Sequence, residues 1–383
     1  MKKNKQLALA LSLSGHHFRR IIEGLGEVLQ YHPEWELLWD VGNLSWATPK
    51  VWTSEADAVI THAIYPCDQP AALAFPGHVI CVSNKREETL FDAVVSDDVE
   101  VGRAAARHML GLGLKQHVFL GTHQDHFYSR ERGRGFQEEV TRHANQDVLD
   151  LTWDWYPGKH NLEAIEGVVQ TIRTRFRPPF SIYCDSDTMA FDLLGVATRL
   201  GLRAPEDFVL MGNDNIHVIC SLSRPRLSSV ELNSPEIGRR VGELLLEGRS
   251  QSPRRIKIPP LGVVARHSTE ISAVEDRVLS KMLAHIHENK GLVGNIEDLA
   301  KQAGISRRLL EKRFQKEIGR SPYQEILRCR LEYAREMLMS TDWPVSRVAE
   351  TCGFAEIHSF NLAFKKETGT SPRKYRQGGQ VAE

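Results

Sequence analysis

An internal repeat in the C-terminal part of the chain constrains the fold more than any other sequence feature. The matching segments are Ile296–Ile305 with Val345–Phe354, and Phe314–Pro322 with Phe364–Pro372. Both copies place a glycine near the end of the first segment, and both end the second segment on Gly-x-Ser-Pro. A repeat at a fixed spacing, here about 50 residues, predicts two similar structural units.

The first copy has the pattern of a helix-turn-helix. Leu299 and Ala303 are four residues apart and lie on the inner face of a first helix. Gly304 permits a tight turn, and Ser306 caps a second helix whose inner face carries apolar residues. The residues left outward on this second helix can reach guanine edges and phosphates in a major groove: Arg307, Arg308, Glu311 and Lys312.

The second copy predicts the same scaffold with a different outward face. Phe360 and Phe364 point inward, and the outward residues are Ile357, His358, Ser359 and Asn361. This face is barely basic, so we expect it to contribute less affinity for DNA than the first copy. Asn and His can still read base edges, and Ile can contact a thymine methyl group. The alternative is a plain helical bundle whose charges only solvate it, but the doubled pattern favours DNA binding.

The N-terminal part has the pattern of an α/β protein. From Leu7 to about Ser268, short apolar runs alternate with amphipathic stretches, which predicts βαβ units and a parallel sheet. The predicted strands are Leu7–Leu13, Ala58–Thr61, His78–Val82, His117–Gly121, Phe180–Cys184, Phe208–Gly212 and Ile256–Pro259. A region of this length predicts two Rossmann-like lobes with a ligand cleft between them.

The β pattern stops near His267, and the sequence is helical from Glu275 onward. We therefore predict an α/β sensor over residues 1–270, of the type found in periplasmic binding proteins, and an all-α domain with two helix-turn-helix motifs over residues 271–383. Within the sensor, the first lobe is expected to span about residues 5–97 and 231–252, and the second lobe about 98–230 and 253–269.

Several function classes are excluded by what the sequence lacks. No apolar run approaches the roughly 18 residues of a membrane helix. The basic start followed by Leu7–Leu13 imitates a secretory signal peptide, but a buried first strand explains it better, so we expect a cytoplasmic protein. The six scattered cysteines have no metal-ligand spacing, so we expect no metal site and no cofactor. No phosphate-loop, dinucleotide-binding or hydrolase motif is present, so we do not expect an enzyme.

Polar residues at the ends of predicted strands are the candidate ligand contacts, because sugar hydroxyls pair with charged and amide groups. Asp214 follows one strand, Asp185 and Ser186 follow another, and Arg132 begins a helix. The first lobe offers Ser12, Ser14, Ser83 and Asn84 at comparable strand ends. Each of these residues could instead cap a loop.

The C-terminal residues Ile296–Arg376 resemble the AraC/XylS family of transcription regulators. The resemblance rests on Cys352-Gly353-Phe354, Phe360, Phe364-Lys365-Lys366, Gly369 and Ser371-Pro372. It implies DNA contacts by Arg308, Glu311 and Lys312 in the first copy, and by His358, Ser359 and Asn361 in the second.

The sensor is similar to the ligand-binding half of LacI/PurR-type repressors, which itself resembles periplasmic sugar-binding proteins. The segments that carry this resemblance are Arg132–Phe136, Asp187–Ala190, Gly201–Asp207, Gly212–Asn215 and Leu227–Val230. Such a sensor in front of an AraC-type tail resembles the layout of xylose operon regulators.

The sequence departs from this family pattern at two ligand-reading places. Ser83-Asn84 stands where sugar binders often carry Asp-Arg, and Leu232 stands where related sensors often carry Gln, between the candidate contacts Glu231 and Asn233. Both departures alter the groups that read hydroxyls, so xylose itself is not assumed.

These observations predict a transcription regulator, an activator by family resemblance, of a carbohydrate-utilisation operon. The expected partners are a double-stranded DNA operator, a small-molecule effector such as a monosaccharide, RNA polymerase, and a second copy in a homodimer. One alternative is a regulator that senses a purine or a sugar acid. Another is a sugar-binding transport component, which would need a signal peptide and no DNA-binding tail.

Overall fold

The computed structural model describes residues 4–11, 15–38, 55–62, 69–87, 90–123, 125–144, 148–153, 162–270 and 277–378. The chain divides into two compact units, Met1–Glu270 and Ile271–Glu383. Among the described residues, no helix is both long enough and apolar enough to cross a lipid bilayer.

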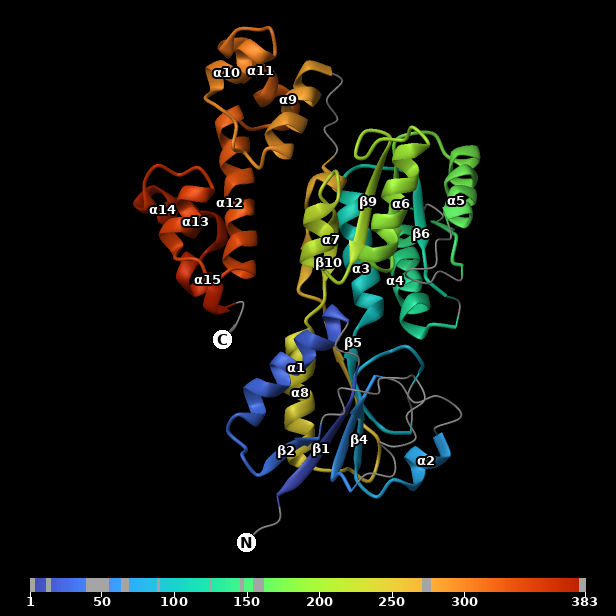
Figure 1. The fold of residues 1–383 in the computed structure, drawn as a ribbon. Helices are drawn as coiled ribbons and strands as arrows, with labels where there is room; N and C mark the ends of the chain where they lie inside the picture. The colour runs from blue at the N-terminus through green and yellow to red at the C-terminus, as the bar shows by residue number, and fades with distance from the viewer. Residues whose placement is uncertain are drawn as a thin grey trace. The chain divides into compact units, whose positions relative to one another are not determined.

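The N-terminal unit contains two six-stranded sheets (Figure 1). Sheet A has the strand order β11-β5-β4-β3-β1-β2, and sheet B has the order β12-β10-β9-β8-β6-β7. Neighbouring strands are parallel except β12, which pairs antiparallel with β10. The strands are β1 (Lys5–Ala10), β2 (Trp35–Leu38), β3 (Ala58–Thr61), β4 (His78–Cys81), β5 (Asp92–Ser96), β6 (His117–Leu120), β7 (Val148–Asp150), β8 (Phe180–Cys184), β9 (Phe208–Asn213), β10 (Ser228–Glu231), β11 (Arg255–Ile258) and β12 (Gly262–Val264).

The central strands of both sheets are buried along their whole length, as β3 and β8 are. This burial explains why they read as continuous apolar runs, since a parallel sheet is covered on both faces. The helices of this unit are α1 (His16–Leu29), α2 (Gln69–Ala74), α3 (Asp98–Gly111), α4 (Phe127–Ala144), α5 (Leu162–Arg175), α6 (Asp187–Arg199), α7 (His217–Leu222) and α8 (Ser234–Glu247), with a short 3₁₀ helix at His267–Thr269.

One predicted lobe boundary differs from the structure. The sequence assigns residues 253–269 to the second lobe, but β11 pairs with β5 in sheet A, which forms the first lobe. The reason is burial, because Ile258 and Ile256 pack into the core of sheet A on this strand. The following strand, β12, joins sheet B, so the chain crosses between the lobes after Ile258.

The C-terminal unit is all helical. Its helices are α9 (Arg277–Glu288), α10 (Ile296–Gln302), α11 (Arg307–Ile318), α12 (Pro322–Ser340), α13 (Val345–Thr351), α14 (Ile357–Thr368) and α15 (Pro372–Gly378). The long helix α12 joins a cluster of α9, α10 and α11 to a cluster of α13, α14 and α15, as Figure 1 shows. Each cluster has its own apolar core, one around Phe314 and one around Phe364. The predicted fold class, two Rossmann-like α/β lobes followed by two helix-turn-helix motifs, is confirmed.

Candidate functional site

A buried arginine is the centre of the polar cluster between the two lobes. Arg132 lies near the start of α4 and is 6% exposed. Its Nε donates to Oδ1 of Asp98 at 2.9 Å, and its Nη1 donates to the carbonyl oxygen of Asp185 at 2.7 Å. The guanidinium also lies 5.1 Å from the centre of the Tyr128 ring. A planar cation held on several sides in this way is oriented before any ligand arrives.

The close crossing of α3 and α4 brings Arg132 to Asp98. A Cβ atom at Gly102 would collide with the carbonyl oxygen of Arg132, and a Cβ atom at Gly135 would collide with that of Val99. Glycine at these two positions therefore allows the helix backbones to touch. Arg132 was predicted to begin a helix, but α4 already begins at Phe127. The depth of its burial follows from the packing of α3 against α4.

Carboxylates outnumber the cation in this cluster. Oδ1 of Asp214 lies 3.8 Å from Nη1 of Arg132, and the Asp214 backbone is held at φ 93°. Burial raises the pKa of Asp214 to about 6 although Arg132 acts in the opposite direction. Burial, together with the charge of Asp214, raises the pKa of Asp187 to about 7. When such buried carboxyl groups are ionised and have few cationic partners, they favour a ligand that donates hydrogen bonds.

Two polar atoms near Arg132 are buried without a hydrogen-bond partner among the described residues. They are Oδ1 of Asp185 and the hydroxyl of Tyr183. The other oxygen of Asp185 accepts from the backbone NH of Thr122 at 2.8 Å and from its hydroxyl at 2.9 Å. Because buried polar groups are normally paired, these atoms mark a place where a polar ligand or water belongs.

Asn84 belongs to the first lobe and joins this cluster through its side chain. Its Nδ2 donates to Oδ2 of Asp98 at 2.6 Å, and its Oδ1 accepts from Arg255 at 2.6 Å. Its carbonyl oxygen accepts from the backbone NH of Tyr128 at 2.8 Å. The residue that departs from the family's Asp-Arg pattern is therefore engaged with both lobes. The neighbouring Ser83 accepts from the backbone NH of Lys85 at 3.2 Å and closes a local turn.

The remaining candidate contacts have local roles or lie further out. Ser186 caps α6 by accepting from the backbone NH of Met189 at 3.4 Å. Asn233 occupies the N-cap position of α8 without a side-chain cap bond. Glu231 ends β10, and burial raises its pKa. Ser12 and Ser14 lie outside the described residues.

Sequence reasoning did not include Asp98 among the candidate ligand contacts. Asp97 caps α3, with Oδ1 accepting from the backbone NH of Glu100 at 3.4 Å. Asp98 instead bridges Asn84 and Arg132, as described above. Its position just after the end of strand β5 could have identified Asp98 as a candidate contact. Strand β5, however, is not among the strands predicted from the sequence.

Helix α11, the second helix of the first helix-turn-helix copy, presents the predicted charged face. Leu310 and Phe314 are fully buried, while Arg308 and Lys312 are exposed. Arg307 is also exposed, but it forms ion pairs with Glu297 and with Glu311, the latter at 2.8 Å. Since Arg307 and Glu311 neutralise each other, the exposed positive charge of this face comes from Arg308 and Lys312.

The second recognition helix, α14, has the same scaffold without that charge. Phe360 and Phe364 are fully buried, and the predicted outward residues Ile357, His358, Ser359 and Asn361 are all exposed. Leu362, which sequence reasoning did not single out, is 60% exposed on the same helix. The repeat could have identified Leu362 as an outward residue, because aligning the two copies pairs it with Lys312.

One arginine on the connecting helix α12 touches both copies. Nε of Arg330 donates to the carbonyl oxygen of Gly291 at 2.9 Å, and Nη1 donates to that of Gly353 at 2.8 Å. Gly353 forms the turn of the second helix-turn-helix with φ 77°, a conformation that favours glycine. Arg330 thus ties the turn of the second copy to the segment between α9 and α10.

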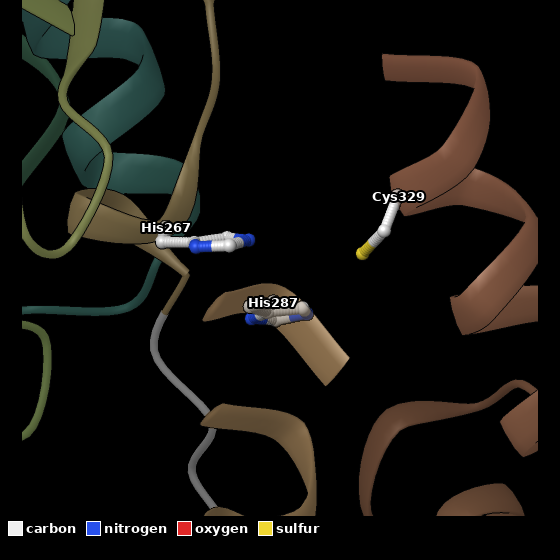
Figure 2. Close-up of side chains that lie close together, drawn as sticks. All are labelled: His267, His287 and Cys329. Carbon is white, nitrogen blue, oxygen red and sulfur yellow. The ribbon is translucent and has the colours of Figure 1, made fainter. Parts of the chain in front are cut away.

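The first copy also has a buried ionic centre. Glu325 of α12 is fully buried and accepts from Nε2 of His287 at 2.5 Å and from Nη2 of Arg328 at 2.8 Å, with Arg320 as a further partner. Nearby, His287 and Cys329 lie close together, with ligand atoms within 4.8 Å (Figure 2); His267, also labelled there, belongs to the N-terminal unit. The two arginines already balance the carboxylate, which disfavours a cation at Glu325.

Two family models match the chain. A periplasmic binding protein-like domain matches residues 106–269, and a helix-turn-helix domain matches residues 299–378. The xylose operon regulatory protein of Escherichia coli (strain K12) is 25% identical over 391 residues, which cover 98% of this chain and 97% of that protein.

Solved structures agree with this division. The structure of the xylose-binding transcription activator XylR aligns with a TM-score of 0.69 at 23% identity and covers 98% of both chains. A LacI family regulator from Enterococcus faecium with bound ribose aligns with a TM-score of 0.55 at 18% identity, over 69% of this chain and 98% of that chain. The resemblance inferred from the sequence, an AraC-type tail behind a sensor of the LacI/PurR type, is confirmed.

Proposed function

We propose that this chain, which has a periplasmic binding protein-like domain and a helix-turn-helix domain, is an AraC-type transcription regulator that controls a carbohydrate-utilisation operon in response to a small polar ligand. The ligand binds around Arg132 between the lobes, and α11 and α14 bind the operator. The observation that carries this proposal is the buried Arg132 with its excess of carboxylates, in a chain that also presents the exposed cations of α11.

The charge of the lobe cluster supports a hydroxylated ligand. The carboxyl groups of Asp98, Asp185 and Asp214 lie around the buried guanidinium of Arg132. Sugar hydroxyls donate to such carboxylates and accept from the guanidinium. A sugar acid would add a further negative charge to a site already rich in carboxylates, which disfavours it. A neutral purine, which has several hydrogen-bond donors and acceptors, stays as the second candidate.

Regulation follows from differential binding to two states of the protein. A ligand that bridges Arg132 of the second lobe and Asn84 of the first binds best when the lobes are closed, and it shifts the population toward that state. The shift changes DNA affinity only by the ligand's difference in affinity for the two states. We propose that the protein works as a homodimeric activator in the cytoplasm, where it contacts operator DNA and RNA polymerase.

A thermal-shift screen against pentoses, hexoses, sugar acids and purines tests the ligand class. A ligand at about a hundredfold its dissociation constant adds roughly 2.7 kcal/mol to the stability of the protein. Asp214→Asn should abolish the shift, whereas the matched variant Asp150→Asn, an exposed aspartate of β7, should retain it. A shift of equal size in both variants would remove Asp214 from the ligand site.

A DNA-binding assay tests the second half of the proposal. The full-length protein is incubated with a random duplex library, and bound duplexes are recovered and sequenced. Enrichment of a two-part motif is the expected result, because two recognition helices read one site. Failure to enrich any sequence at low salt would contradict sequence-specific DNA binding.

A further inference from the structure

We propose that Leu362 is an apolar base-reading residue of α14 that contacts the 5-methyl group of thymine in the major groove. This inference rests on the proposed DNA binding and adds which base α14 recognises. Leu362 is not part of the core of its subdomain, since its side chain is 60% exposed.

Helix geometry places Leu362 at the middle of the outward face. Successive residues of an α-helix are rotated by about 100°. Leu362 is two residues from Phe360 and two from Phe364, which are both fully buried. It therefore projects about 160° away from each of them, toward the side opposite the core. Among the residues that the structure describes, Leu362 is not part of the apolar core around Phe364.

The repeat shows which residue occupies the position of Leu362 in the first copy. Phe364 corresponds to Phe314, so Leu362 occupies the place of Lys312 on α11. Lys312 is an exposed cation suited to phosphates and guanine, whereas leucine can offer neither charge nor hydrogen bonds. The apolar group that double-stranded DNA displays in the major groove is the thymine methyl.

The neighbours of Leu362 fit the same base pair. Asn361 is exposed beside it, and asparagine can pair with the N6 and N7 atoms of adenine. Lys365 and Lys366 are exposed one turn further along, where they can reach the phosphate backbone. An amide for adenine next to an apolar side chain for thymine suits A·T pairs, so the second half-site should be rich in them.

The test uses the duplex that the full-length protein enriches from a random library. Each thymine is replaced in turn by deoxyuridine, which pairs identically but lacks the 5-methyl group. We expect one or two replacements in a single half-site to lower wild-type affinity about three- to tenfold. The same replacements should leave the affinity of Leu362→Ala unchanged, because its methyl contact is already absent.

Two further variants sharpen the assay. Leu246→Ala, an exposed leucine of α8 in the N-terminal unit, should bind like the wild type and keep its deoxyuridine penalty. Leu362→Lys, which copies the first helix, should bind more tightly at low salt and no longer distinguish thymine from deoxyuridine. Unfolding temperatures confirm that the variants remain folded.

Three results would overturn the inference. A wild-type protein that tolerates deoxyuridine at every thymine has no methyl contact. A deoxyuridine penalty that persists in Leu362→Ala assigns the contact to another residue. If Leu362→Ala keeps full DNA affinity but loses activation of transcription in vitro, the face binds a protein instead. Absence of any enriched duplex would instead refute the proposed DNA binding itself, and the inference with it.

Discussion

The two helix-turn-helix copies have the same arrangement of buried core residues, but their exposed side chains differ at almost every position. Phe314 and Phe364 are both fully buried at equivalent places, and Gly319 and Gly369 end the two recognition helices in the same left-handed conformation. At equivalent outward positions, α11 carries the cations Arg308 and Lys312, whereas α14 carries His358 and Leu362. The two copies are therefore alike in the residues that form their cores and turns, and they differ in the residues that face outward.

The internal supports of the two copies differ as well. Glu325 is the buried ionic centre of the first copy, and the repeat places Tyr375 at the corresponding position of the second. The Tyr375 ring packs edge-on to Phe364 with 5.3 Å between ring centres. One copy is therefore held by charges and the other by aromatic packing, and the two should respond differently to pH.

The largest effect is expected from removing the charge at Glu325. Glu325→Gln should destabilise the first copy by about 3 kcal/mol, because it leaves Arg320 and Arg328 without their buried partner. Amide hydrogen exchange should show lost protection in α10 and α11 and unchanged protection in α14. The exposed Glu367→Gln in α14 serves as the matched control. Equal loss of protection in both copies would mean that they unfold as one unit.

Acid should separate the copies in the same way. Hydrogen bonds and the charges of His287 and Arg328 hold the pKa of Glu325 below its ordinary range despite burial. A lowered folded-state pKa stabilises the protein above the ordinary carboxyl pKa, and this contribution is lost as pH falls through and below that value. We expect α11 to lose exchange protection before α14 between about pH 5 and pH 3. Glu325→Gln should remove this difference, which makes it the control.

Affinity for DNA should depend more on the first copy. The double variant Arg308→Ala/Lys312→Ala should weaken binding roughly hundredfold, about 2.7 kcal/mol, and reduce the salt dependence. His358→Ala/Asn361→Ala should cost about tenfold and leave the salt dependence nearly unchanged. Lys115→Ala/Arg203→Ala removes the same charge from the N-terminal unit and should bind normally. Electrophoretic shifts at several salt concentrations measure all three, and equal salt slopes would refute the distinction.

The orientation of the copies can be tested at Arg330. Arg330→Met should lower affinity for the two-part site by about tenfold, since both carbonyl contacts are lost. It should also tolerate one inserted base pair between the half-sites better than the wild type does. Arg330→Lys keeps the charge but loses the forked geometry, so it separates the two effects. A variant as sensitive to spacing as the wild type would show that α12 alone fixes the orientation.

The smallest effect should come from the helix caps. Ser306 caps α11 by accepting from the backbone NH of Leu309, whereas Glu356 at the start of α14 makes no side-chain cap bond. Ser306→Ala should cost about 1 kcal/mol, and Glu356→Ser should add a few tenths to about 1 kcal/mol. Urea unfolding monitored by exchange in each helix would measure both. A loss of stability in Glu356→Ser would mean that this glutamate has another stabilising partner.

Much of the fold could be predicted because its signals are local. Strands β3 and β8 have their predicted bounds, since each is a short apolar run with clear ends. Strands β5 and β10 were missed because Asp92 and the serines of β10 interrupt the apolar pattern, although these residues are buried in the structure. The lobe to which β11 belongs was predicted wrongly, because its pairing with β5 depends on residues more than a hundred positions away in the chain.

The candidate ligand site followed the sequence less closely. Asp214 and Arg132, both predicted ligand contacts, lie together. Ser83 and Ser186 make local turn and cap bonds, which was the other interpretation of each. Asp98 was missed because nothing in its own neighbourhood distinguishes a residue that caps a helix from one that binds an arginine of another helix.

By itself, the sequence determined the division into an α/β region and a doubled helix-turn-helix, because repeats and periodicity are properties of the chain. It also determined which face of each recognition helix is outward, since burial follows helical spacing. Only the tertiary structure decided that Asp98 and Asn84 meet Arg132, and that Arg330 joins the two copies. Such contacts depend on how closely helix backbones approach, and that distance is set by packing across the fold, as at Gly102 and Gly135.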